Sequence, residues 1–275
     1  MNQPFHFAHR SQFATRALQF VRTCIALILV CFNPMTIQAA NPTNNPAAGD
    51  KQGTYVIVHG AWGGGWDWKH VDQLLTADGN KVYRPTLTGQ GERSHLASTN
   101  IDLDTHIQDI VNVILWEDLH DVVLVGHSYG GMVITGVADR VPDRIRHVIY
   151  LDAFIPEDGE SANAIRHHTG IDRPITNGFV MPTWVTNCPP PPHDVPMPAK
   201  TFSEPVSLKN QAIAGRLPTT YILTVEKGKV AEQDEFYPFY QRAQARGWIA
   251  LIMEGDHNVQ RSHPVELVRL LEQAP

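Results

Sequence analysis

Short apolar segments recur along the chain from Thr54 onward, separated by longer and more polar stretches. They occupy residues 55–58, 81–84, 122–125, 148–151, 221–225 and 248–253. Most of them lack an alternation of polar and apolar positions, which is typical of strands buried on both faces. Strands of this kind predict a mostly parallel sheet that is covered by helices on both sides.

The stretches between these strands have the spacing of amphipathic helices. In residues 104–115 the apolar positions Ile107, Ile110, Val111, Ile114 and Leu115 fall on one helical face. Further helices are predicted over 70–78, 131–141, 236–246 and 264–272. Strands that alternate with helices define an α/β fold.

Residues 157–217 break this alternation, because they are rich in proline and show no clear periodicity. A structureless loop of that length is unusual inside a compact domain. We therefore predict that the segment forms an inserted cap over the carboxyl edge of the sheet.

The first 40 residues have the character of a secretory signal peptide. No acidic residue precedes Asp50, whereas Arg10, Arg16 and Arg22 lead into an apolar run at 24–32 that ends in small residues. The run is shorter than the roughly 20 residues that cross a bilayer, so no stable membrane anchor is expected. Residues 41–53 read as a flexible linker and 54–275 as one globular domain. A functional leader predicts a periplasmic or secreted protein; without one the protein would be cytoplasmic.

Composition narrows the possible partners. The 275 residues carry a net charge of -6 without a run of like charges, which excludes the basic surface of a nucleic-acid-binding protein. Cys24 and Cys31 lie in the leader, so Cys188 has no partner for an internal disulfide in the mature chain. The histidines lack the spacing of zinc ligands, and no metal site is expected.

The sequence Gly126-His-Ser-Tyr-Gly130 directly follows the strand at 122–125 and precedes a predicted helix. In this context G-x-S-x-G is a nucleophile elbow, a turn so tight that its flanking positions must be glycine. The partial positive charge of the helix N-terminus favours an anion that develops beside the serine. We predict Ser128 as a catalytic nucleophile.

A serine nucleophile requires a histidine base and a carboxylate that orients it. His257 follows the last strand, the position that the chain order nucleophile, acid, base assigns to the base. The same order favours Glu226, just after the strand at 221–225, as the acid. Asp152, which follows the strand at 148–151, is the alternative.

The loop after the first strand is rich in glycine, which lets a backbone approach a substrate closely. Backbone N–H groups of Ala61 in this loop and of Tyr129 after the nucleophile are the expected oxyanion hole. The loop lacks the spacing of a phosphate-binding motif. We expect a substrate pocket that is lined by Gly60, Trp62, Phe154 and Trp184.

Four motifs resemble the plant methyl esterase and hydroxynitrile lyase branch of the α/β hydrolases, over about residues 55–271. They are VHGA at 58–61 with GGWDW at 64–68, GHSYGG at 126–131, LDAFIP at 151–156 and GDH at 255–257. The resemblance implies an α/β-hydrolase fold with an eight-stranded sheet and a small cap. It also implies cofactor-free catalysis on small esters, with the nucleophile, base and oxyanion donors at the positions given above.

Two departures from this branch matter. Its lyases have a threonine where this chain has Gly60 and a lysine where it has Asn258, and these groups serve cyanohydrin cleavage. The branch usually has the aspartate of its triad at the position that Lys227 occupies here. The triad acid of this chain is therefore either Glu226 or Asp152.

These observations predict a serine carboxylesterase-type hydrolase. Its substrate would be a small apolar ester, or a lactone, cleaved through an acyl-enzyme intermediate. Two alternatives stay open: a lyase on the same scaffold, and a non-catalytic receptor that binds a small ligand.

Overall fold

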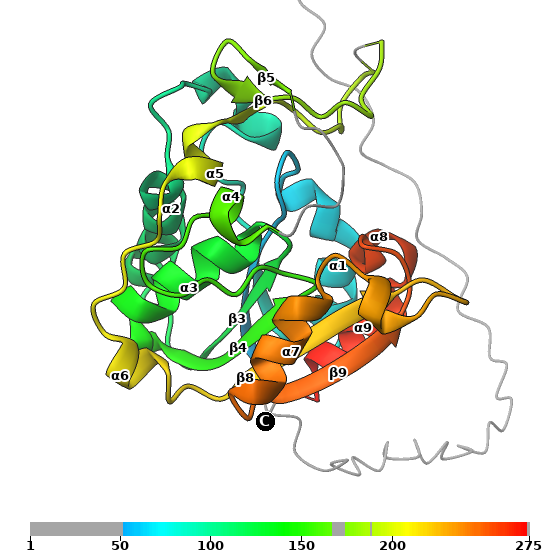
Figure 1. The fold of residues 1–275 in the computed structure, drawn as a ribbon. Helices are drawn as coiled ribbons and strands as arrows, with labels where there is room; N and C mark the ends of the chain where they lie inside the picture. The colour runs from blue at the N-terminus through cyan, green and yellow to red at the C-terminus, as the bar shows by residue number, and fades with distance from the viewer. Residues whose placement is uncertain (1–51, 167–173, 188, 274–275) are drawn as a thin grey trace, which may run out of the picture. The chain divides into compact units, whose positions relative to one another are not determined.

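Six parallel strands form the main sheet of the computed structural model, which describes residues 52–166, 174–187 and 189–273 (Figure 1). The strands are β1 (Thr54–Val58), β2 (Lys81–Tyr83), β3 (Val122–His127), β4 (Ile145–Leu151), β8 (Thr219–Val225) and β9 (Ile249–Glu254). Their order across the sheet is β2-β1-β3-β4-β8-β9. The expected parallel sheet is confirmed.

The central strands β1, β3, β4 and β8 are buried on both faces, as their uninterrupted apolar sequences predict. Val56 and Val58 of β1 belong to the core on one face, while Tyr55 and Ile57 belong to the core on the other. This division follows from the two-residue period of a strand, which sends successive side chains to opposite faces.

Helices complete the two cores. The face of Tyr55 and Ile57 is covered by α1 (Lys69–Ala77), α8 (Val259–Ser262) and α9 (Pro264–Leu271). The opposite face is covered by α2 (Leu103–Trp116), α3 (Gly130–Arg140) and α7 (Tyr237–Ala245). Short 3₁₀ turns lie at Gly65–Trp68, Gly91–Leu96, Pro142–Arg144 and Ala231–Gln233.

The number of strands differs from the expectation. Within the described residues the main sheet has six strands, not eight. The six are the same six that the segments from Thr54 onward predict.

The strand order reverses next to β1. From β1 the chain runs outward to β2 and then returns across β1 to β3. The loops that leave β1 and β3 therefore diverge, and ligands of open α/β sheets bind in the crevice at such a point. The loop after β1 starts at His59, and the loop after β3 carries Ser128.

Residues 157–217 contain short elements that the sequence pattern does not predict. An antiparallel sheet of β5 (Ile175–Thr176), β6 (Phe179–Val180) and β7 (Met197–Pro198) accompanies α4 (Ala162–Ile165), α5 (Lys200–Ser203) and α6 (Gln211–Ala214). In Figure 1, β5, β6 and α5 lie together, away from the main sheet. We call residues 157–217 the cap.

The predicted signal peptide and nearly all of the predicted linker lie outside the described residues. Over the described part of the chain, no helix is long and apolar enough to cross a membrane.

Candidate active site

Ser128 stands at the turn between β3 and α3 with a left-handed backbone, φ +54°. This conformation is strained for a residue with a side chain. It is held by three backbone hydrogen bonds. The Ser128 N–H donates to the Leu151 carbonyl at 3.2 Å, and the Ser128 carbonyl accepts from the N–H groups of Gly131 at 3.0 Å and Phe154 at 3.2 Å. A Cβ at Gly126 would lie 2.8 Å from the Gly130 carbonyl oxygen, so the turn needs glycine there. The structure thus forms the elbow that the motif predicts.

His257 lies in the loop that follows β9, and its partner is Asp152, directly after β4. The imidazole Nδ1–H donates to Asp152 Oδ2 at 2.6 Å. The other carboxylate oxygen accepts a 3.0 Å hydrogen bond from the Thr224 N–H of β8. The Asp152 side chain is 2% exposed, and its left-handed backbone, φ +44°, turns the carboxylate toward the histidine.

Glu226, the acid favoured by chain order, does not reach His257. Its side chain is 54% exposed and pairs with Lys229 at 2.9 Å. The chain turns back immediately after Glu226, where the Lys229 N–H donates to the Glu226 carbonyl, and this turn keeps the glutamate at the surface. The structure thus keeps Glu226 away from His257 and brings Asp152, the alternative that the sequence left open, to the histidine.

The electrostatic setting of His257 favours its cation. Burial lowers the pKa of His257, but the hydrogen bond and charge of Asp152, with the charges of Glu235 and Asp234, outweigh burial and leave the pKa above its ordinary value. A base with a raised pKa holds a transferred proton more firmly.

Two neighbouring rings fix the imidazole. Phe236 stacks on His257 with centroids 4.9 Å apart and planes at 13°. On another side, the His127 ring lies 4.6 Å away, and its Nε2–H donates to the His257 carbonyl at 2.7 Å. Burial and the charge of His257 hold the pKa of His127 well below its usual value, which favours the neutral imidazole. The sequence motif gives no sign that His127 serves the histidine loop.

The backbone N–H groups of Ala61 and Tyr129 donate to no protein acceptor among the described residues. Both residues line the same cavity as Ser128. A Cβ at Gly60 would lie 3.0 Å from His127 Nδ1 and 3.2 Å from Ser128 Cβ, so glycine lets this loop approach the serine. Two free donors beside a serine are what an oxyanion hole requires.

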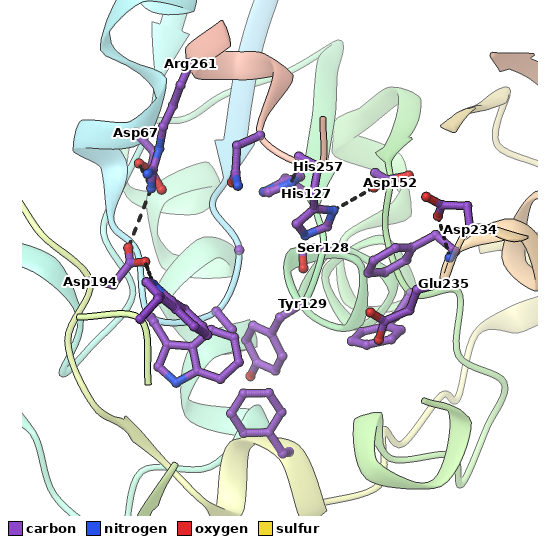
Figure 2. Close-up of a pocket in the computed structure, with 18 residues that line it drawn as sticks. Asp67, His127, Ser128, Tyr129, Asp152, Asp194, Asp234, Glu235, His257 and Arg261 are labelled. Carbon is purple, nitrogen blue, oxygen red and sulfur yellow. Dashed lines mark hydrogen bonds and ion pairs between the residues drawn. The ribbon is translucent and has the colours of Figure 1, made fainter. Parts of the chain in front are cut away.

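Ser128 and His257 open into a cavity of about 470 Å³ (Figure 2). All four predicted pocket residues line it: Gly60, Trp62, Phe154 and Trp184. Six aromatic side chains form much of its wall, namely Trp62, Tyr129, Phe154, Trp184, Phe202 and Phe236. Trp184 and Phe202 come from the cap, so the cap contributes directly to the cavity.

Six charged side chains line the cavity, and only Asp152 among them is assigned a role from the sequence. They are Asp67, Asp152, Asp194, Asp234, Glu235 and Arg261. Arg261 of α8 pairs with Asp67 and, at 3.6 Å, with Asp194 of the cap. Burial raises the pKa of Asp67 to about 6, although Arg261 opposes the shift.

In the part of the chain that the structure describes, no group of three or more His, Cys, Asp or Glu side chains is arranged to hold a metal ion.

Comparison with known proteins identifies the class to which this fold and site belong. A sequence profile of the α/β hydrolase family matches residues 55–270. The chain therefore belongs to the α/β hydrolase family.

Individual relatives narrow the branch. A segment of 111 residues, 40% of this chain, is 54% identical to a carbendazim-hydrolysing esterase of a Nocardioides species and spans 46% of that protein. The pFDCC methylesterase MES16 of Arabidopsis thaliana is 28% identical over 80% of this chain and 93% of its own length. An extracellular α/β-hydrolase of a Paenibacillus species has 25% identity and a TM-score of 0.62 over 81% of this chain and 98% of its own. The resemblance to the plant methyl esterase branch is confirmed.

Proposed function

We propose that this protein is a serine carboxylesterase in which Ser128, His257 and Asp152 form the catalytic triad. The observation that carries the proposal is the 2.6 Å hydrogen bond between His257 and the buried Asp152, next to a serine on a strained elbow. The esterases among its relatives support the same reaction.

The triad would act in two half-reactions. His257 Nε2 takes the proton of Ser128 while the serine oxygen attacks the ester carbonyl carbon. The carbonyl oxygen becomes an oxyanion that accepts hydrogen bonds from the Ala61 and Tyr129 N–H groups. The C–O bond to the alcohol breaks as His257 returns the proton to the leaving oxygen, which leaves an acyl group on Ser128.

Water completes the cycle. His257 takes a proton from a water molecule whose oxygen attacks the acyl carbon, and then returns that proton to Ser128 as the acid leaves. Throughout, Asp152 stabilises the imidazolium and holds Nδ1 as the proton donor, so that Nε2 faces the serine.

The cavity favours a small, flat and uncharged ester. Its volume of about 470 Å³ falls within the range for drug-sized ligands. Aromatic rings from the loop after β1 and from the cap offer flat apolar surfaces. Five carboxylates face one arginine, which disfavours an anionic substrate. A lactone of similar size would be opened by the same steps.

The first test is hydrolysis of a p-nitrophenyl ester series by the wild type and by Ser128→Ala. We expect turnover of short acyl esters with a burst of nitrophenol, and a loss of about 10⁴-fold or more in Ser128→Ala. An inert wild type, or an active Ser128→Ala variant, contradicts the proposal. Mandelonitrile is assayed in parallel, because cyanide release would indicate a lyase instead. We expect none, since the cavity has Gly60 and Asn258 at the positions where lyases of this branch have threonine and lysine.

We also propose that the protein is exported through residues 1–40. The support is the leader pattern of the sequence and the description of the similar Paenibacillus hydrolase as extracellular. N-terminal sequencing of the protein recovered from the periplasm or medium tests this proposal, and exclusive recovery of an uncleaved chain in the cytoplasm contradicts it.

A further inference from the structure

Trp62 directly follows the proposed oxyanion donor Ala61 and has an unusual backbone. Its φ is +64°, in the left-handed region. A bulky residue with a Cβ adopts this region at a cost and keeps it only where its surroundings impose it.

The contacts come from the cap. The Trp62 indole Nε1–H donates to the Val180 carbonyl at 3.0 Å, and the Trp62 carbonyl accepts from the Val195 N–H at 2.9 Å. The indole meets Trp184 edge-on with ring centroids 5.0 Å apart and packs on Phe202 at 5.5 Å. All four partners belong to residues 157–217, so the cap holds both the backbone and the side chain of Trp62.

The contacts between the cap and Trp62 also affect Ala61, the residue before Trp62. A change in φ of Trp62 rotates the chain on one side of its N–Cα bond relative to the other. The loop after Trp62 is confined, because a Cβ at Gly64 would lie 3.2 Å from the Gly91 Cα and a Cβ at Gly63 would lie close to the Asp67 carboxylate. Relaxation of Trp62 would therefore displace Ala61, whose N–H is free for the oxyanion.

We propose that the cap positions the oxyanion hole through Trp62, in addition to covering the substrate. The inference rests on the serine esterase mechanism proposed above, in which the Ala61 N–H stabilises the transition state. Trp62 is a positioning residue: its two hydrogen bonds to the cap keep Ala61 aligned with Ser128. Loss of either bond weakens transition-state stabilisation more than it weakens substrate binding.

Two variants remove these bonds from opposite sides. Trp62→Phe keeps an aromatic ring against the cap but has no indole N–H. Val195→Pro leaves the sequence of the loop after β1 unchanged and removes the N–H that donates to the Trp62 carbonyl, because proline has no N–H. Trp66→Phe is the matched control: it makes the same change in the same loop, but the Trp66 Nε1 has no hydrogen-bond partner within the described residues and the side chain does not line the cavity.

The readouts are kcat and KM on a p-nitrophenyl ester, and the inhibition constant of a trifluoromethyl ketone of the same size, which forms a tetrahedral adduct with the serine. In Trp62→Phe and Val195→Pro we expect kcat to fall about tenfold or more while KM stays within about threefold. The ketone should bind more weakly in proportion to the loss in kcat/KM, since it depends on the same donors. Trp66→Phe should keep wild-type kinetics.

Full kcat in either test variant overturns the inference, and so does a rise in KM alone, which would make Trp62 only a wall of the cavity. An equal loss of kcat in Trp66→Phe would also overturn it, because the effect would then belong to the loop in general. Ser128→Ala is measured beside these variants: if it keeps the activity, the proposed function itself fails, which is a separate result.

Discussion

Replacement of Asp152 by asparagine, next to replacement of Glu226 by glutamine, tests which carboxylate serves His257. Asparagine at 152 can still accept the Thr224 N–H hydrogen bond through its side-chain oxygen, so the local fold should persist. It cannot stabilise an imidazolium by charge, and its amide can impose the wrong tautomer on Nδ1. In serine hydrolases this change lowers kcat by about 10³–10⁴-fold, roughly 4–5.5 kcal/mol of transition-state stabilisation.

Glu226→Gln should change almost nothing. The Glu226 side chain is exposed and its ion pair with Lys229 is of the surface type, which contributes about 0–1 kcal/mol to folding. We expect kcat/KM within about twofold of the wild type, because no described contact joins this side chain to the cavity.

The assay is the initial rate and the burst of nitrophenol on one p-nitrophenyl ester, with the melting temperature recorded for each variant. The melting temperature reports whether each variant is folded, so a fall in rate at an unchanged melting temperature is assigned to chemistry and not to unfolding. A large loss in Glu226→Gln with a nearly normal Asp152→Asn would refute the assignment of the acid.

Three further outcomes are expected. Asp234→Asn keeps an acceptor for the Phe236 N–H but removes a charge that raises the pKa of His257. Because His257 must be neutral to act as a base, the acidic limb of the pH–kcat/KM profile should move to lower pH, and an unmoved limb would contradict this. Arg261→Met leaves the buried Asp67 carboxylate without its cation, so we expect about 2 kcal/mol of destabilisation in urea unfolding. The loss should be larger at pH 8 than at pH 5, because Asp67 is protonated at the lower pH, and equal losses at both pH values would count against this account. A p-nitrophenyl ester with an anionic acyl chain, such as the succinate half-ester, should show kcat/KM at least about tenfold below that of its neutral methyl ester, and equal values would show that the carboxylates of the cavity do not act on substrate charge.

The sequence could predict the sheet and the places of Ser128 and His257 at its carboxyl edge, because each depends on local order. A buried strand, a tight turn and a helix N-terminus place Ser128 without reference to distant residues. His257 likewise follows from its place just after the last strand. These features need only the direction of the chain and the parallel sheet.

The acid could not be predicted in the same way, because two strands each end in a carboxylate. Asp152 turns toward His257 through a left-handed residue and a hydrogen bond from the neighbouring strand, while Glu226 is carried outward by the turn at Lys229. Such turns depend on packing between strands that lie far apart in sequence. The contacts of Trp62 with the cap could not be predicted for the same reason, because Val180 and Val195 are more than a hundred residues away from Trp62 in the sequence.

The position of Asp152, directly after β4, also affects how an enzyme of this kind could diversify. In the plant methyl esterase branch the triad acid belongs to the loop after β8, so changes in that loop can lower the catalytic rate. The triad proposed here takes its members from the ends of β3, β4 and β9, and the segment 227–233 contains none of them. That segment leads directly to Asp234, Glu235 and Phe236 at the wall of the cavity. Insertions or substitutions in it could therefore reshape substrate preference, in evolution or in a directed library, without a change to any residue of the proposed triad.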